Sequence, residues 1–86
     1  MIRRVSFRLI FQMKYIHNAH RRLYFVALLS LGCPSTDREV TQYVGLSDPN
    51  YFRPRRHELM RDGFIVKCGK RKCKVSGKTA LTWWFA

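Results

Sequence analysis

Alternating start and stop signals divide the centre of the chain into short helices. Asn18 is a residue type that caps helices, because its side-chain oxygen accepts backbone N–H groups that have no partner in the first turn. The helix that it opens is predicted to end at Gly32, which tolerates the left-handed C-terminal conformation, with Pro34 shortly after. The residues expected to face inward are Leu23, Val26, Ala27 and Leu31.

A second, shorter helix is predicted to follow at once. Thr36 and Glu39 form the Thr-x-x-Glu pattern of a capping box, in which the hydroxyl accepts one backbone N–H and the carboxylate accepts another. Gly45 marks the end of this helix, and Leu46 is expected to fill the turn behind it. The residues expected to face inward are Val40, Tyr43 and Val44.

A third helix is predicted over residues 51–62, with Gly63 as its stop signal. Pro54 requires this helix to begin near Asn50, because a proline deeper in a helix removes a hydrogen bond and clashes with the preceding turn. The residues expected in the core are Phe52, Leu59 and Met60. The outward face is then polar and cationic, and consists of Asn50, Arg53, Pro54, His57 and Arg61.

Two runs of strand-forming residues, 64–68 and 79–85, end the chain and predict a β-hairpin. The segment between them, 69–78, is too long and too charged to be a tight connector, and we expect a flexible basic loop. Because successive strand residues face opposite sides, Trp83 is expected to anchor the core and Trp84 to be exposed.

The N-terminal arm, residues 1–17, has an ambiguous pattern. Val5, Phe7, Leu9 and Phe11 alternate as in a strand, whereas a second set of apolar residues recurs at helical spacing. We favour the strand. Since a chain of 86 residues can form only one compact core, the predicted organisation is this arm followed by a single domain over residues 18–86.

The charge balance points to a polyanionic partner. Seventeen Lys and Arg residues oppose five Asp and Glu residues, which gives a formal net charge of +12. Nucleic acid is the first class of partner that this suggests and an acidic membrane surface the second. The longest apolar stretch, residues 25–31, is far shorter than the roughly 20 residues of a membrane span, and we expect no membrane partner. Three cysteines leave at least one thiol unpaired in the chain, which favours a reducing cytoplasm.

The ordered set of signals resembles a known family. The segments that carry the resemblance are Thr36-Asp37-Arg38-Glu39-Val40, Gly45-Leu46-Ser47, Phe52-Arg53-Pro54-Arg55-Arg56-His57-Glu58-Leu59, Gly63-Phe64-Ile65, and Ser76-Gly77-Lys78 before Trp83. Over residues 18–85 the chain is similar to the small winged helix-turn-helix proteins of bacteriophages and bacterial regulators. This implies an α+β fold in which three helices precede a two-stranded β-hairpin wing.

The resemblance and the charge together imply sequence-specific binding to double-stranded DNA, with the third helix in the major groove and the wing on the backbone or minor groove. Asn and Arg are the types that make bidentate contacts to adenine and guanine, whereas flexible lysines suit phosphates. The residues expected to contact DNA are Ser47, Asn50, Tyr51, Arg53, Arg55, His57, Arg61, Lys70, Arg71, Lys72, Lys74 and Lys78. Arg56 projects toward the core edge, and we expect it to pair with Glu39 instead.

Other kinds of site find little support. Cys68 and Cys73 on opposite arms of the hairpin, even with His17 and His20, lack the usual zinc-knuckle spacing, so we expect no metal and no other cofactor. Cys33 and His57 suggest a nucleophile and base, but no orienting third residue is identifiable. The chain is therefore not expected to be an enzyme.

Two alternatives concern protein partners. A small adaptor directed at a host protein could use the same scaffold to bind an acidic protein surface, because such a surface attracts a +12 chain as a phosphate backbone does. A homodimer could form through the N-terminal arm, the first helix or Trp84. The leading prediction is a cytoplasmic transcription regulator of phage or bacterial type.

Overall fold

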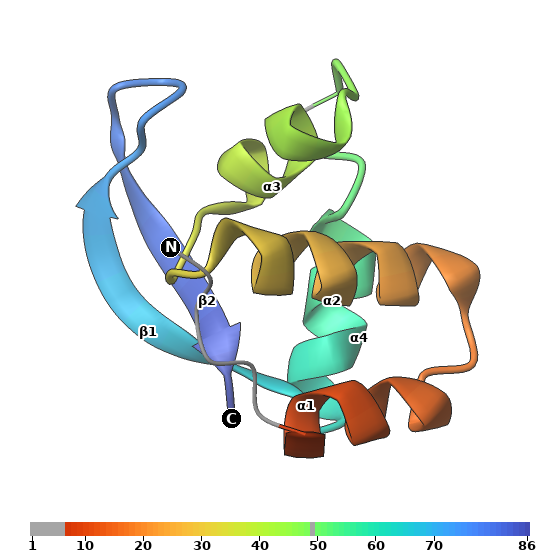
Figure 1. Cartoon of the computed structure of the whole chain (residues 1–86). Coiled ribbons are helices and arrows are strands. Elements are labelled where there is room, and N and C mark those ends of the chain that lie inside the picture. The colour runs from red at the N-terminus through yellow and green to blue at the C-terminus, as the bar shows by residue number, and fades with distance from the viewer. Residues whose placement is uncertain (1–6, 49) are drawn as a thin grey trace.

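The computed structural model describes residues 7–48 and 50–86. Its elements are α1 (Phe7–Gln12), the 3-10 helix η1 (Met13–Tyr15), α2 (Ala19–Leu31), α3 (Asp37–Val44), α4 (Arg53–Arg61), β1 (Ile65–Lys72) and β2 (Thr79–Phe85). The three helices α2, α3 and α4 precede an antiparallel hairpin, which is the predicted α+β winged-helix layout. Figure 1 shows the hairpin along one side of the helices, with its turn at the level of α3 and with α1 lying beside α2.

The strand predicted for the N-terminal arm is wrong for residues 7–15, which form α1 and η1; the rest of that prediction, residues 1–6, lies outside the described residues. Leu9 and Met13, one helical turn apart, both pack against the core, and Ile16 behind them is buried. Phe11, which the strand pattern places on the same side as Leu9, is 48% exposed. The helical spacing therefore prevails, because it brings the arm's apolar residues onto the core.

The predicted caps of α2 and α3 are confirmed. The Asn18 side chain accepts the backbone N–H groups of His20 and Arg21 at 2.8 and 3.2 Å. Both halves of the capping box are present, since Thr36 Oγ1 accepts the Glu39 N–H and Glu39 Oε1 accepts the Thr36 N–H, each at 3.1 Å. These bonds join near neighbours in the sequence, which is why the sequence alone predicts them.

The inward faces of α2 and α3 differ from the prediction. The buried residues of α2 are Tyr24, Phe25, Ala27 and Leu28. Leu23 and Val26, predicted to face inward, are 40% and 37% exposed. Tyr43 in α3, also predicted to face inward, is more than half exposed. Because α2 is apolar almost all round, its pattern does not select a face. Contacts with other elements do so: the Tyr24 hydroxyl donates to Asp37 Oδ1 at 2.9 Å.

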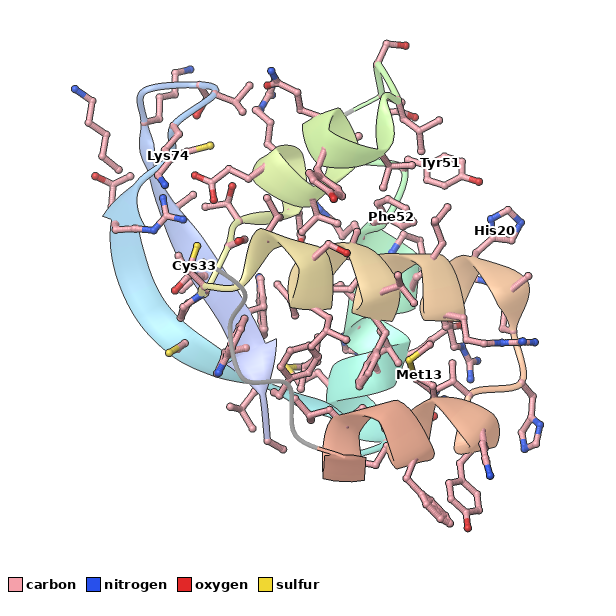
Figure 2. All side chains as sticks on the ribbon, in the orientation of Figure 1. Met13, His20, Cys33, Tyr51, Phe52 and Lys74 are labelled. Carbon is pink, nitrogen blue, oxygen red and sulfur yellow. The ribbon has the colours of Figure 1, made fainter. Side chains whose placement is uncertain are left out.

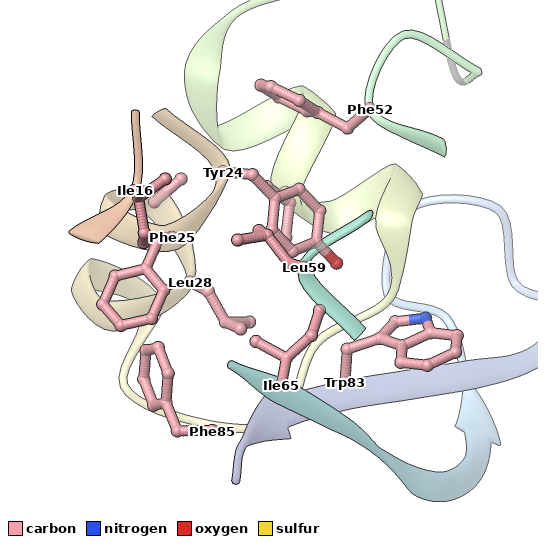
Figure 3. Close-up of a cluster of buried hydrophobic side chains, with 11 residues drawn as sticks. Ile16, Tyr24, Phe25, Leu28, Phe52, Leu59, Ile65, Trp83 and Phe85 are labelled. Carbon is pink, nitrogen blue, oxygen red and sulfur yellow. The ribbon is translucent and has the colours of Figure 1, made fainter. Parts of the chain in front are cut away.

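The core lies between α2, α4 and the base of the hairpin. Its largest side chains, shown in Figure 3, are Ile16, Tyr24, Phe25, Leu28, Phe52, Leu59, Ile65, Trp83 and Phe85. Phe52, Leu59 and Trp83 were predicted to be there. Trp84, predicted to be exposed, is half-buried and packs against the cluster, with its ring 4.7 Å from that of Phe85.

α4 begins slightly later than predicted, at Arg53, with Pro54 in its first turn. Residues 50–52 form a turn instead of helix, in which the N–H of Arg53 donates to the carbonyl of Asn50 at 3.3 Å. Proline is harmless in a first turn because no intrahelical bond needs its N–H there. The turn leaves Asn50 and Arg53 exposed in front of the helix.

The hairpin is longer and more ordered than predicted. β1 continues to Lys72, so Lys70, Arg71 and Lys72 lie on a strand and only residues 73–78 form the turn. Cys68 lies on β1 and Cys73 is the first residue of the turn, so the prediction that they lie on opposite arms is wrong; the three cysteines are free thiols.

A β-bulge explains the extra length. Two residues between Lys67 and Lys70 oppose the single residue Thr82 on β2. Gly69 takes a φ of 107°, which a side chain would disfavour, so its glycine marks a bulge and not the end of the strand. A bulge bends a strand, and β1 is visibly curved in Figure 1.

The base of the hairpin is joined to the helices through the linker between α2 and α3. Ser35 pairs with Trp83 as an isolated antiparallel bridge, with N···O distances of 3.2 and 2.9 Å. This bridge fixes β2, while the outer edge of β1 has no strand partner within residues 7–48 and 50–86. In the described part of the chain, no helix is long and apolar enough to cross a membrane.

Candidate nucleic-acid interface

Four of the five acidic residues form ion pairs with arginines. The described ion pairs are Arg21–Glu58 (2.9 Å), Arg21–Asp62 (3.6 Å), Arg55–Glu58 (3.0 Å), Arg56–Asp37 (3.1 Å), Arg61–Asp62 (3.2 Å) and Arg71–Glu39 (2.6 Å). The fifth acidic residue, Asp48, accepts the backbone N–H of Asn50 at 2.9 Å. Among the described side chains, no lysine takes part in an ion pair. Arg21, Arg56 and Arg71 therefore join different elements of the fold, the pairs of Arg55 and Arg61 are local to α4, and the described lysines are exposed.

The predicted pair between Arg56 and Glu39 is wrong. Arg56 Nε donates to Asp37 Oδ2 at 3.1 Å, and its guanidinium lies 4.2 Å from the ring centroid of Trp83. Asp37 and Glu39 are two residues apart in α3, so they project about 200° apart around the helix axis. Asp37 faces α4 while Glu39 faces the hairpin. The structural role expected for Arg56 is kept, with a different partner.

Glu39 connects three segments of the chain. Arg71 donates to Oε1 and Oε2 at 2.6 and 2.7 Å, and the Lys74 N–H donates to Oε2 at 2.8 Å, in addition to the capping bond from Thr36. Burial would raise the pKa of this carboxyl, but the hydrogen bonds from Arg71, Lys74 and Thr36 outweigh it and lower the pKa to about 2. Glu39 is therefore ionised at neutral pH.

Arg71, predicted to contact DNA, donates its hydrogen bonds to groups of the protein itself. Besides Glu39, its guanidinium donates to the carbonyls of Pro34 and Lys72 at 2.9 and 3.0 Å. The hydrogen bond to Glu39 raises the pKa of Arg71 above its ordinary value. The Arg71 side chain therefore holds the hairpin, and few of its guanidinium N–H donors remain for a phosphate.

Other cations remain exposed and without a carboxylate partner. Of the predicted contacts, these are Arg53 at the start of α4 and the hairpin residues Lys70, Lys72, Lys74 and Lys78. Sequence reasoning missed Arg38, an exposed arginine in the first turn of α3. The signal was its position between Asp37 and Glu39: when both neighbours face other elements, the residue between them points outward.

A groove of about 460 Å³ lies between α3, α4 and the hairpin. Arg38 lines it from α3, Asn50 and Arg53 from the start of α4, and Ser76 from the hairpin turn. Trp83 and Arg56 also line it. The structure thus brings two predicted contacts, Asn50 and Arg53, into one cleft beside the basic hairpin.

The remaining predicted residues of α4 and of the segment before it do not line this groove. Ser47 is exposed in the turn before α4, and His57 and Arg61 are exposed along the helix. Arg55 is half-buried against Glu58. Tyr51 is 37% exposed, but its hydroxyl forms a 2.7 Å hydrogen bond with His20 Nδ1, and Figure 2 shows the two side chains together beside α2.

Comparison with known proteins returned no matching protein-family model, no matching curated protein and no matching solved structure. Within residues 7–48 and 50–86, no three His, Cys, Asp or Glu side chains cluster in a way that could hold a metal ion.

The ionisation of Glu39 predicts an acid-sensitive fold. Its pKa is about 2 in the folded protein against an ordinary value of 4.5, so its contribution is complete above about pH 4.5 and is lost as the pH falls toward 2. The shift corresponds to about 3 kcal/mol. Urea unfolding between pH 7 and 2.5 should show a loss of stability in acid that is smaller by about this amount in Glu39→Gln. Parallel pH profiles for the two proteins would contradict this assignment.

The division between structural and exposed arginines predicts different stabilities for two substitutions. Arg56→Ala should lower the free energy of unfolding by about 2 to 4 kcal/mol, because it leaves Asp37 partly buried without its partner and uncovers Trp83. Arg53→Ala should change it by less than about 0.5 kcal/mol, since an exposed, unpaired side chain is removed. Thermal and urea denaturation measure both, and equal losses would show that the division is wrong.

Proposed function

We propose that this protein binds double-stranded DNA as a cytoplasmic, winged-helix transcription regulator of phage or bacterial type. The observation that carries the proposal is the sorting of the cations. Arg21, Arg56 and Arg71 join different elements through carboxylates. Six exposed cations without a carboxylate partner lie on the groove and on the outer half of the hairpin beside it, namely Arg38, Arg53, Lys70, Lys72, Lys74 and Lys78, while Lys14, Arg22 and Lys67 are exposed elsewhere.

The exposed face of α4 suits base recognition. Arg53, His57 and Arg61 recur every fourth residue, so they lie along one side of a helix narrow enough for the major groove. Asn50 and Arg53 lie at its N-terminal end, where helix-turn-helix proteins place the side chains that reach base edges. We assign sequence reading to this end of α4.

The hairpin suits the sugar-phosphate backbone or the minor groove. Its lysines are flexible point charges without a carboxylate partner, and they contact phosphates without the fixed geometry that base recognition needs. Arg38 provides a further backbone contact from the other wall of the groove. We infer that the backbone of one DNA strand runs past Arg38 and the hairpin turn.

A second candidate function, an adaptor for an acidic protein surface, is favoured by one observation. A mainly apolar hollow of about 230 Å³ lies between α3 and the hairpin turn. Tyr43 and Val75, 55% and 42% exposed, line it together with Lys74. An apolar hollow beside a cation could hold a hydrophobic side chain of an acidic peptide.

Salt dependence distinguishes the two candidates. If Arg38, Arg53, Lys70, Lys72, Lys74 and Lys78 neutralise about six phosphates, log K for duplex DNA should fall against log[salt] with a slope of roughly −5. Fluorescence anisotropy with a labelled duplex would measure this slope, at salt concentrations from about 50 to about 300 mM, which span the physiological ionic strength. A slope near zero would remove DNA as the partner.

Two single substitutions separate reading from positioning. Arg53→Ala should weaken binding and relax the preference at one base pair by about 1 to 3 kcal/mol, whereas Lys72→Ala should weaken binding to all sequences alike. Selection of bound sequences from a random duplex pool, repeated with each variant, provides the comparison. An unchanged preference in Arg53→Ala would show that this end of α4 does not read bases.

A further inference from the structure

We propose that Glu39 is a positioning residue that holds the basic hairpin at a fixed angle to α3 and α4, so that the hairpin lysines are already in place for a polyanion. The inference rests on the proposed function, because it assigns the binding consequence to DNA. From charge alone, the Glu39 carboxylate would be expected to weaken binding to a negative partner such as DNA. The proposed role is the opposite, because Glu39 would favour binding.

The contacts of Glu39 join α3 to the end of β1 and to the hairpin turn. Arg71 lies near the end of β1 and Lys74 lies within the turn, and both donate to the same carboxylate, at 2.6 to 2.8 Å. The third donor, Thr36, belongs to the helix side of the junction. Figure 2 shows Lys74 at the hairpin turn on the side next to α3. Only 7% of Glu39 is exposed.

The distal half of the hairpin has few other ties to the helices. Ser35 and Trp83 join the base of the sheet, while Thr36 Oγ1 and Cys73 Sγ meet at 3.2 Å beneath the turn. The residues 74–79 are all exposed. Glu39 and its partner Arg71 therefore supply the main charged link between the turn and α3.

A fixed hairpin favours binding because the cost of ordering it is met during folding and not during association. Lys74 is one of the two hairpin residues that donate to Glu39, and Lys72 lies between them, so the contacts of Glu39 set where both lysine side chains begin. Loss of the link should leave the lysines present but spread over many orientations. Removal of Glu39 also raises the net charge from +12 to +13, which by Coulomb attraction alone would strengthen binding to DNA.

These opposite expectations define the experiment. Glu39→Gln preserves the capping pattern, since Gln also serves at that position of a capping box, but it removes the charged pair with Arg71. Glu58→Gln is the matched control, because Glu58 also pairs with arginines and its loss raises the net charge equally, yet its arginine partners Arg21 and Arg55 belong to α2 and α4 and not to the hairpin. Arg71→Lys is a second variant that keeps the charge and loses the fork.

Two measurements are made on the full chain. Duplex DNA affinity is measured at one salt concentration, and hydrogen exchange of the Lys74 amide is measured without DNA. We expect Glu39→Gln and Arg71→Lys to bind about tenfold more weakly and Glu58→Gln to bind no more weakly than the original protein. The Lys74 amide should exchange about tenfold faster in Glu39→Gln only, because its acceptor is weakened there.

The outcomes separate the two proposals. Equal changes in affinity for Glu39→Gln and Glu58→Gln would overturn the positioning role, because charge would then explain both. Unchanged exchange at Lys74 would overturn the link itself, whatever the affinities. If the original protein bound no duplex DNA while Lys74 exchange still rose in Glu39→Gln, the link would stand and the proposed function would fall. A circular dichroism melt of each variant verifies that the measured protein is folded.

Discussion

Asp37 and Glu39 leave the first turn of α3 in nearly opposite directions, and each carboxylate meets an arginine from a different part of the fold. Asp37 meets Arg56 of α4, and Glu39 meets Arg71 of β1. A chain with 17 cations and five acids cannot neutralise all its charge, so the location of the acids decides which elements are joined. One helical turn thereby sets the positions of both the α4 helix and the hairpin.

The choice of cation follows the same division. Arginine suits a pair of fixed geometry because its guanidinium is a planar fork, and every described ion pair uses one. Lysine is a mobile, strongly hydrated point charge, and the lysines of the hairpin are exposed. Arg53 and Arg38 are exceptions, since they are exposed forks beside the groove. Because they lie beside the groove and have no carboxylate partner, they are candidates for contacting DNA and not for joining elements of the fold.

The features that the sequence predicts well are local. The caps at Asn18 and Thr36 involve donors within three residues, and the winged-helix order of three helices and a hairpin follows from such signals. Features that depend on distant partners were missed. The buried face of α2 is set by Tyr24 meeting Asp37, and the length of β1 by a bulge at Gly69 that resembles a stop signal in the sequence.

The candidate site was predictable to the same extent. The exposure of Arg53 follows from the helical projection of α4, which is a local property, whereas Asn50 is exposed in the turn before the helix. Whether a given cation is available for a partner is not local, because it depends on which of five carboxylates it meets across the fold. Arg71 and Arg38 illustrate this, since one of two exposed-looking arginines is bound by Glu39 and the other is not.

The double duty of Glu39 has a thermodynamic consequence. The same carboxylate completes the capping box of α3 and receives Arg71 and Lys74 from the hairpin. Anything that frays the first turn of α3 therefore weakens the hold on the hairpin, and anything that orders the hairpin also supports the cap. A polyanion that fixes the hairpin lysines should thus also stabilise the first turn of α3, because the hairpin and the cap of α3 share the Glu39 carboxylate as an acceptor.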